Sequence, residues 1–388
     1  MDFSLSAEQQ QIRESILKLC AELGDDYWLA KDRAGTFPHE FHAALATAGW
    51  LGIAMPVEHG GAGLGITEAA IMMQAIAESG AAMTGASSVH MNIFGLQPVV
   101  KLGTDEQKRR MLPPLIAGKD KACFAVTEPD AGLDTTSLKV RAERRGDHYV
   151  ISGQKIWIST AQVANKALIL ARTTPLGEVK RKTDGLSLFY TDIDRSHVAI
   201  RPIDKMGRRA VDSNEMFFDA MPVPSSDRIG AEGDGFRAIL QGMNPERILI
   251  AAEAVGIGRA ALRKASAYAR ERVVFRRPIG QNQGIAHPLA KCWMSLEAAN
   301  LMAMKAATLY DCNLECAAEA NAAKYLAAEA AFAACETAVM THGGMGYAKE
   351  FHVERYLREV MIARIAPVTP HMILNFIAEK ALGLPKSY

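Results

Sequence analysis

The spacing of apolar residues changes twice along this chain, and this change limits the folds that the chain can adopt. Over most of the first 119 residues apolar side chains recur at helical spacing. Between about Cys123 and Asp219 the pattern becomes that of short strands separated by Gly, Pro, Asp and Asn. From Gly235 onward long helical patterns rich in Ala and Leu return. A single uniform helical or β architecture is therefore excluded.

These three segments of different apolar periodicity predict an α+β multidomain protein. We expect an all-α N-terminal domain over residues 1–119 and a middle β domain over residues 120–230, with a compact, antiparallel, barrel-like sheet. Residues 231–388 should form a C-terminal α-helical bundle of four helices. The length of 388 residues is sufficient for such a set of domains.

Composition excludes several classes of function. Charged residues make up 22 % of the chain and the net charge is only +1, whereas a nucleic-acid partner usually requires a concentrated basic face. The start, MDFSLSAEQQQ, lacks the basic and apolar segments of a signal peptide, and we expect no membrane span. The six cysteines are scattered without His partners at zinc-ligand spacing, so no metal site is expected. The cytoplasm is the expected location.

One carboxylate stands at the start of an apolar helical pattern. In GMNPERILIAAEAVGIGRAA, Asn244 is expected to be the N-cap, Pro245 the first helical residue, and Glu246 a residue of the first turn. A negative charge is favourable there because of the helix dipole, and this plain role explains Glu246 in an anonymous helix. Only a surrounding site would give Glu246 a further function.

Two stretches of the β region could form the wall of a ligand site. In CFAVTEPDAGLD, Thr127 offers a hydroxyl at a strand end, and in SGQKIWIS, Trp157 offers a flat aromatic surface beside Ser159. A planar ligand with polar edges suits such a wall, although a Trp in a strand is more often part of a core. Later in the chain, HGGMGY has glycines at 343, 344 and 346 that permit close backbone approach, but alone it indicates a turn between helices.

Four motifs, in order and at matching spacing, resemble those of the acyl-CoA dehydrogenase family of flavoproteins, over essentially the whole chain. AVTEPDAGLD and GGMGYAKEFHVERYLRE resemble the two family signatures, and GQKIWIS resembles the flavin-flanking strand. ERVVFRRPIGQNQ resembles the segment that reaches the FAD of a neighbouring subunit. The resemblance implies the acyl-CoA dehydrogenase fold, FAD as cofactor and a homo-oligomer, typically a tetramer. It implies that the residues contacting FAD are Phe124, Val126, Thr127, Trp157, Ser159, Arg272, Phe275, Gln283, Gly343, Gly344 and Thr369.

The resemblance also identifies a catalytic base. In most family members the base is a Glu before a Gly-Thr pair near the C-terminus, but here RIAPVTPHMIL places Pro367 at that position, and proline cannot accept a proton. A minority, the isovaleryl-CoA and long-chain types, carries the base in a segment that resembles NPERILIAAE, where Glu246 stands. The same matching implies substrate contacts at Asn244, Arg247 and Leu133, although Leu133 replaces a small hydroxyl residue of the family.

The implied activity is the FAD-dependent α,β-dehydrogenation of an acyl-CoA thioester to the trans-2-enoyl-CoA. Glu246 would remove the α proton and flavin N5 would take the β hydride. The implied setting is fatty acid metabolism, with an electron-transferring flavoprotein as acceptor. Two alternatives remain open at this point: a non-dehydrogenating, desulfinase-like lyase, and a non-catalytic FAD- or CoA-binding subunit. The segment Ser79 to Val100, which resembles part of the acyl pocket, contains no Arg or Lys and so argues against an acidic acyl group. Acyl length and branching are not specified by the sequence.

Overall fold

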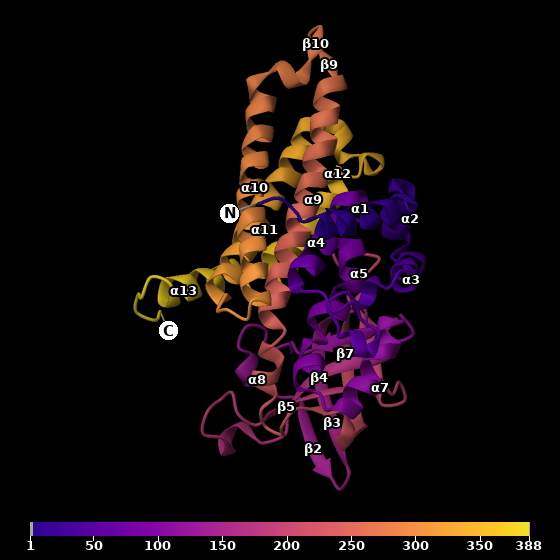
Figure 1. Ribbon diagram of the computed structural model, residues 1–388, viewed down its shortest axis with the longest axis vertical. Coiled ribbons are helices and arrows are strands. Elements are labelled where there is room, and N and C mark those ends of the chain that lie inside the picture. Colours follow the sequence, from indigo (N-terminus) through magenta and orange to yellow (C-terminus); the bar gives the residue numbers. More distant parts are fainter. Residues whose placement is uncertain (1–2, 388) are drawn as a thin grey trace.

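The computed structural model describes residues 3–387 and has the three expected parts in the expected order. The ends of the first and last predicted domains, residues 1–2 and 388, lie outside the described residues. In Figure 1 the long helices of the C-terminal part run along the length of the molecule, and the N-terminal helices lie against them. The sheet occupies the lower end of the view. The α+β arrangement predicted from the change in periodicity is confirmed.

The N-terminal part is helical because its segments combine apolar faces with polar caps. Ser6 Oγ accepts a hydrogen bond from the backbone N–H of Gln9, and Thr104 Oγ1 accepts one from that of Gln107, so two helices begin with complete capping boxes. The helices α4 and α5 are almost entirely buried and form the centre of this part. The main helices are α1 (Ala7–Ala21), α2 (Asp25–Ala34), α3 (His39–Thr47), α4 (Ile66–Ile76), α5 (Ala82–Phe94), α6 (Gln97–Leu102) and α7 (Asp105–Ile116).

The middle part is an eight-stranded sheet whose neighbouring strands follow the order β6-β7-β3-β2-β4-β5-β8, with β1 paired to β4. Most pairings are antiparallel, as expected, but β1 and β2 each pair with β4 in parallel, and the path of strands does not close into a barrel. A second cluster of buried apolar residues fills the inner face of this sheet. The strands are β1 (Ala122–Ala125), β2 (Arg141–Arg145), β3 (His148–Ser159), β4 (Lys166–Arg172), β5 (Leu186–Asp192), β6 (Val198–Pro202), β7 (Ser213–Pro224) and β8 (Arg228–Ile229).

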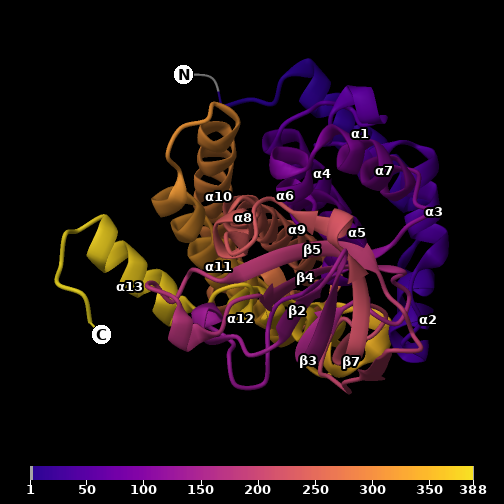
Figure 2. The same ribbon diagram turned by 90° about the horizontal axis from the view of Figure 1, so that it is seen from below.

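The C-terminal part is a bundle built around α9, which packs against α4, α5, α10 and α11. Gly256 of α9 permits the close approach to α4, because a Cβ there would lie 2.4 Å from the carbonyl oxygen of Gln74. Figures 1 and 2 show that the last helix, α13, projects away from the bundle. The elements are α8 (Gly235–Leu240), α9 (Met243–Glu271), β9 (Val273–Val274), β10 (Arg277–Pro278), α10 (Gln283–Asp311), α11 (Ala317–His342), α12 (Val353–Ile365) and α13 (Pro370–Lys380).

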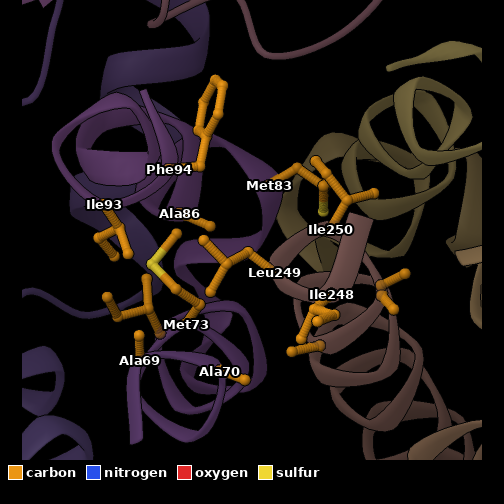
Figure 3. Packing of buried hydrophobic residues seen from close by; sticks show 14 of the residues in the cluster. Ala69, Ala70, Met73, Met83, Ala86, Ile93, Phe94, Ile248, Leu249 and Ile250 are labelled. Atoms are coloured by element: carbon orange, nitrogen blue, oxygen red, sulfur yellow. The ribbon is translucent and has the colours of Figure 1, made fainter. Parts of the chain in front are cut away.

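The contact between α5 and α9 forms part of the main hydrophobic core. Figure 3 shows Met83 and Ala86 of α5 facing Leu249 and Ile250 of α9. All four side chains are buried. Because these side chains are buried against one another, they hold the first turns of α9 in place relative to α5.

One stretch, Val353–Lys380, has the length and composition of a membrane-spanning helix, which the sequence analysis did not single out. The structure divides this stretch into two helices, α12 and α13, with non-helical residues 366–369 between them. It is therefore not one continuous helix in this fold.

Candidate active site

Glu246 lies in the first turn of α9, as predicted, but the start of the helix differs from the prediction. The helix begins at Met243, and Gly242 occupies the cap position without a side-chain hydrogen bond. The prediction that Asn244 is the N-cap is therefore wrong: α8 ends at Leu240, and a short turn leads directly into α9. The amide side chain of Asn244 instead accepts a hydrogen bond from Arg247 Nη1 at 3.3 Å.

The surroundings of Glu246 bring its pKa close to physiological pH. The side chain is partly buried, and desolvation by burial raises the pKa of Glu246 to about 7, against the opposing charges of His90 and Arg247. A carboxyl group with such a pKa can be unprotonated near neutral pH and still bind a proton strongly. Perturbation of this kind is typical of functional sites.

A cavity of about 480 Å³ lies beside the start of α9, between α9, α11 and α13. Its lining includes Asn244, Arg247, Asn321 and Phe376. The Nε atom of Arg247 is buried and has no hydrogen-bond partner among the described residues. A cavity lined by a guanidinium with a free N–H donor can hold an anionic or strongly polar ligand. Glu246 itself does not line this cavity, and it lies one residue before Arg247 on the helix.

The turn between α12 and α13 occupies the place where most of the family carries its base. Buried Lys324 donates hydrogen bonds to the carbonyl oxygens of Val368 at 2.7 Å and Arg364 at 3.4 Å, and thereby holds this turn against α11. Lys324 also acts electrostatically on Glu246, so the turn and Glu246 face the same region. Pro367 offers no ionisable group there, so the turn supplies no base of its own. Thr369 caps α13 directly after the turn.

The five expected flavin contacts of the β domain lie together. Phe124 belongs to β1, Val126 and Thr127 follow it, and Trp157 and Ser159 belong to β3. The two segments are joined by a hydrogen bond from the Ile156 N–H to the Thr127 carbonyl oxygen at 2.9 Å. All five side chains are partly or fully accessible, which a ligand-facing wall requires.

A β-bulge directs Trp157 outward. The register between β3 and β7 shifts between Lys155 and Ile158, so β3 carries one extra residue at this point. Trp157 has a φ of 61°, and its side chain is 56 % exposed. A backbone conformation that is uncommon for a non-glycine residue is therefore maintained where the indole faces outward, which is typical of a functional position.

Aromatic rings connect this wall with the neighbourhood of Glu246. The ring centroids of Phe124 and Phe94 are 5.2 Å apart, and those of Phe94 and His90 are 4.7 Å apart. The charge of His90 in turn acts on Glu246. The wall and the carboxylate thus border one continuous region between the sheet and the helices α5 and α9.

Thr369 caps α13 beside the cavity at the start of α9, and the other remaining expected flavin contacts lie at the opposite end of α9. This helix has 29 residues, so its two ends are about 40 Å apart. Arg272, Phe275 and Gln283 are exposed there, around the short hairpin β9–β10 that Figure 1 shows at the far tip. Gly343 and Gly344 are also exposed, and a Cβ at either position would meet no atom within 4 Å, so a ligand can approach their backbone. One chain therefore does not bring all the expected contacts together.

Other predicted and unpredicted residues complete the description. Leu133 is exposed in the loop after β1. Three residues with strong interactions near Glu246 were missed by the sequence analysis: His90, Arg208 and Glu253. No motif marks them, since their contacts join segments that are far apart in the sequence.

The comparisons with known proteins cover almost the entire chain. Family models described as the N-terminal, middle and C-terminal domains of acyl-CoA dehydrogenase match residues 6–119, 123–221 and 233–382. The chain is 38 % identical, over 100 % of its length and 99 % of the relative's, to the acyl-CoA dehydrogenase FadE12 of Mycobacterium tuberculosis. It is 33 % identical to the caffeyl-CoA reductase-Etf complex subunit CarC of Acetobacterium woodii, over 86 % and 87 % of the two chains.

Solved structures agree with this relationship. A glutaryl-coenzyme A dehydrogenase in complex with glutaryl-CoA has a TM-score of 0.94 at 29 % identity, with coverage of 100 % of this chain and 98 % of the other. An FAD complex of PigA has a TM-score of 0.93 at 27 % identity, with coverage of 99 % and 100 %. The accessible wall around Trp157 and the open backbone at the glycine pair fit a large planar cofactor with a phosphate-bearing tail. The chain therefore belongs to the acyl-CoA dehydrogenase family and is an FAD-dependent oxidoreductase that acts on CH–CH bonds.

Proposed function

We propose that the protein dehydrogenates an acyl-CoA thioester to the trans-2-enoyl-CoA, with Glu246 as the base that removes the α proton. The observation that carries this proposal is the position of Glu246: a partly buried carboxyl with a pKa raised to about 7 by burial, next to the lining of a cavity and to the aromatic path that leads to the β wall. The family relationship supports the reaction class.

Each part of the site has a distinct task in this proposal. The cavity beside α9 holds part of the coenzyme A moiety, with Asn244 and Arg247 as polar contacts. Glu246 accepts the α proton, and the electron pair of that C–H bond becomes the new double bond. FAD, held by the wall around Thr127 and Trp157, would supply the acceptor for the β hydrogen as a hydride. The walls formed by α5 and α9 exclude water and align the two C–H bonds, which supplies much of the rate enhancement.

Anaerobic mixing with acyl-CoA thioesters tests the reaction itself. We expect straight or branched acyl-CoAs to bleach the flavin absorbance and to yield one enoyl-CoA per flavin reduced. Tight binding of acyl-CoA without bleaching would favour the non-catalytic subunit, and loss of an acyl substituent without a net change in flavin would favour the desulfinase-like lyase. Either of these results would contradict the proposed dehydrogenation.

We also propose that the active protein is a homo-oligomer, expected to be a tetramer, in which two chains contact each FAD. The separation of the expected contacts into two groups at opposite ends of α9 supports this proposal. The projecting helix α13 supports it as well, since Leu374 is 49 % exposed on α13 and Leu382 is 68 % exposed just after it.

Phe275 provides a test of the shared cofactor site, because its ring is 93 % exposed in one chain. Phe275→Ala should lower FAD affinity about fivefold, since a lost aromatic contact costs on the order of 1 kcal/mol. The measurement is the FAD content and the mass of the protein after gel filtration. Leu176→Ala, an exposed apolar residue of the middle domain, is the control and should change neither. Shared binding would be contradicted if the wild-type protein elutes as a monomer and the Phe275→Ala variant retains as much FAD as the wild type.

For the electron acceptor we propose an electron-transferring flavoprotein. The relative CarC is named as a subunit of a complex with such a protein, which supports this choice. Reduction of an electron-transferring flavoprotein should exceed peroxide formation when both are measured with the same acyl-CoA. Under this proposal the enzyme serves fatty acid metabolism in the cytoplasm. Predominant peroxide formation would instead indicate an oxidase.

A further inference from the structure

Four side chains form a polar cluster beside the otherwise apolar contact of α5 with α9. We call Ser87, His90, Arg208 and Glu253 the polar cluster; Arg208 is partly buried and the other three are buried. His90 Nδ1 lies 2.5 Å from Glu253 Oε1, and Arg208 Nη1 donates to Ser87 Oγ at 2.9 Å. His90 is 9 % exposed and Glu253 is 0 % exposed. Arg208 reaches α5 from the loop between β6 and β7, so three separate segments of the chain meet here.

The polar cluster borders the same region between α5 and α9 as Glu246. Ser87 and His90 are three residues apart on α5 and share one face of it, and Glu246 and Glu253 are seven residues apart on α9 and share one face of that helix. Two helical turns correspond to about 10 Å along α9. His90 interacts electrostatically with both carboxyl groups, so it lies near both of them. An acyl group whose α carbon is at Glu246 would therefore extend towards the polar cluster.

Hydrogen-bonding capacity in the polar cluster is left unused. His90 Nε2 and Glu253 Oε2 are buried and have no partner among the described residues. The guanidinium of Arg208 carries five N–H donors, and one of them is used, on Ser87. Ser87 accepts that bond and keeps its own hydroxyl hydrogen to donate. A buried donor without a partner is costly, so a ligand group that accepts a hydrogen bond explains His90 Nε2 better than packing does, whereas Glu253 Oε2 is an acceptor and gains nothing from such a group.

The charges of the polar cluster favour an anionic ligand group. Burial opposes a charge on His90, but the adjacent Glu253 carboxylate outweighs burial and raises the pKa of His90. When the ring is protonated it donates from Nε2, and its charge and that of Glu253 then cancel. The Glu359 carboxylate, which also acts on Arg208, is already paired with Arg355 at 3.0 Å. The positive charge of Arg208 is what remains for a ligand.

We propose that the polar cluster binds a carboxylate at the far end of a short acyl chain, so that the substrate is the CoA thioester of a dicarboxylic acid. The inference rests on the proposed dehydrogenation and specifies its substrate class. It departs from the sequence-based argument against an acidic acyl group, which considered only Ser79 to Val100. Arg208, which lies outside the segment Ser79 to Val100, supplies the positive charge that this segment lacks. Its hydrogen-bond partner Ser87 lies within the segment.

Glutaryl-CoA and pentanoyl-CoA are matched probes, because they have the same chain length and differ in a terminal carboxylate against a terminal methyl group. In wild type, flavin bleaching should have a kcat/KM at least about tenfold higher with glutaryl-CoA, as expected for one charge-assisted hydrogen bond. Monomethyl glutaryl-CoA, which keeps the oxygens but loses the charge, should fall between the two. Equal values for all three, or preference for pentanoyl-CoA, would overturn the proposal.

Variants assign the preference to the polar cluster. Arg208→Leu should reduce the ratio of the glutaryl to the pentanoyl value towards one, Arg208→Lys should restore part of it, and His90→Phe should also reduce it. Arg209→Leu, an exposed neighbour in the same loop, is the control and should keep the wild-type ratio. If Arg208→Leu does not fold, Ser87→Ala removes the contact of Arg208 and should lower the ratio as well. An unchanged ratio in the folded Arg208 or Ser87 variant would contradict the assignment.

Calorimetric binding of the two thioesters separates this inference from the proposed function. If no thioester bleaches the flavin, the dehydrogenation proposal fails, yet tighter binding of glutaryl-CoA that depends on Arg208 would still support the polar cluster as a carboxylate site. If bleaching occurs without any preference in rate or binding, the dehydrogenation stands and the carboxylate site is wrong.

Discussion

Glu246→Gln should slow flavin reduction by roughly 10²-fold or more while the binding of FAD and acyl-CoA stays close to that of wild type. The amide has nearly the same shape as the carboxylate but cannot accept the α proton, and loss of a positioned general base typically has an effect of this size. The helix start is not affected, because its first turn is held by backbone contacts such as that of the Glu246 N–H with the Gly242 carbonyl oxygen. The measurement is single-turnover flavin reduction with the best substrate.

Asp105→Asn is the matched control for this experiment. Asp105 is also a carboxylate in the first turn of a helix, α7, and it is exposed. It should alter stability by a few tenths of a kcal/mol and leave flavin reduction unchanged. If Glu246→Gln behaves as Asp105→Asn does, Glu246 has only the plain role of a charge at a helix start, and the chain lacks an identified base.

Glu128→Gln should lower the free energy of unfolding by about 3 kcal/mol and weaken FAD retention. Glu128 is buried and accepts hydrogen bonds from Lys155 Nζ at 2.9 Å and from the backbone N–H groups of Lys139 and Val140 at 2.6 and 2.9 Å. Lys155 is 0 % exposed, and removal of its partner leaves an uncompensated buried charge. Lys155 also donates to the Val126 carbonyl oxygen, so the damage reaches the wall that faces the flavin.

The exposed ion pair of the same loop provides the comparison. Asp130 and Lys139 are 2.9 Å apart, but their side chains are more than 70 % exposed, and an ion pair of this kind contributes little. Asp130→Asn should therefore change stability by less than about 1 kcal/mol and leave FAD content unaffected. Denaturant unfolding followed by flavin fluorescence measures both quantities. Equal losses of stability and FAD content in the two variants would show that burial does not increase the contribution of the Glu128–Lys155 pair.

The elements of the fold could be predicted where local patterns determine them. The strands around Tyr149, Leu168 and Phe189 and the capped helices after Ser6 and Thr104 follow from periodicity and capping, which are properties of short segments. The N-cap at Asn244 was predicted wrongly, because Asn is a favourable cap in general but here the preceding helix α8 leads into α9 almost without interruption. The open path of the sheet depends on which strands pair across long separations.

In the candidate site, too, residues within local motifs could be predicted and contacts between distant segments could not. The motif residues Thr127 and Trp157 could be located from the sequence through their resemblance to a family, but the bulge that directs Trp157 outward depends on pairing with β7. The polar cluster could not be located, since Arg208 and Ser87 are 121 residues apart and His90 and Glu253 are 163 residues apart. Such contacts arise from the packing of domains, and no local pattern encodes them.

The pH dependence of flavin reduction is the most direct test of Glu246 as the base. At acyl-CoA concentrations below saturation, the rate reports the ionisation of the free enzyme. Only the unprotonated carboxylate can accept the α proton, so the rate in wild type should rise with pH, with an inflection near the pKa of about 7, and then level off. Glu246→Gln should lose this inflection as well as the rate. A wild-type profile that is flat between about pH 5 and 9, or the same inflection in Glu246→Gln, would contradict the account.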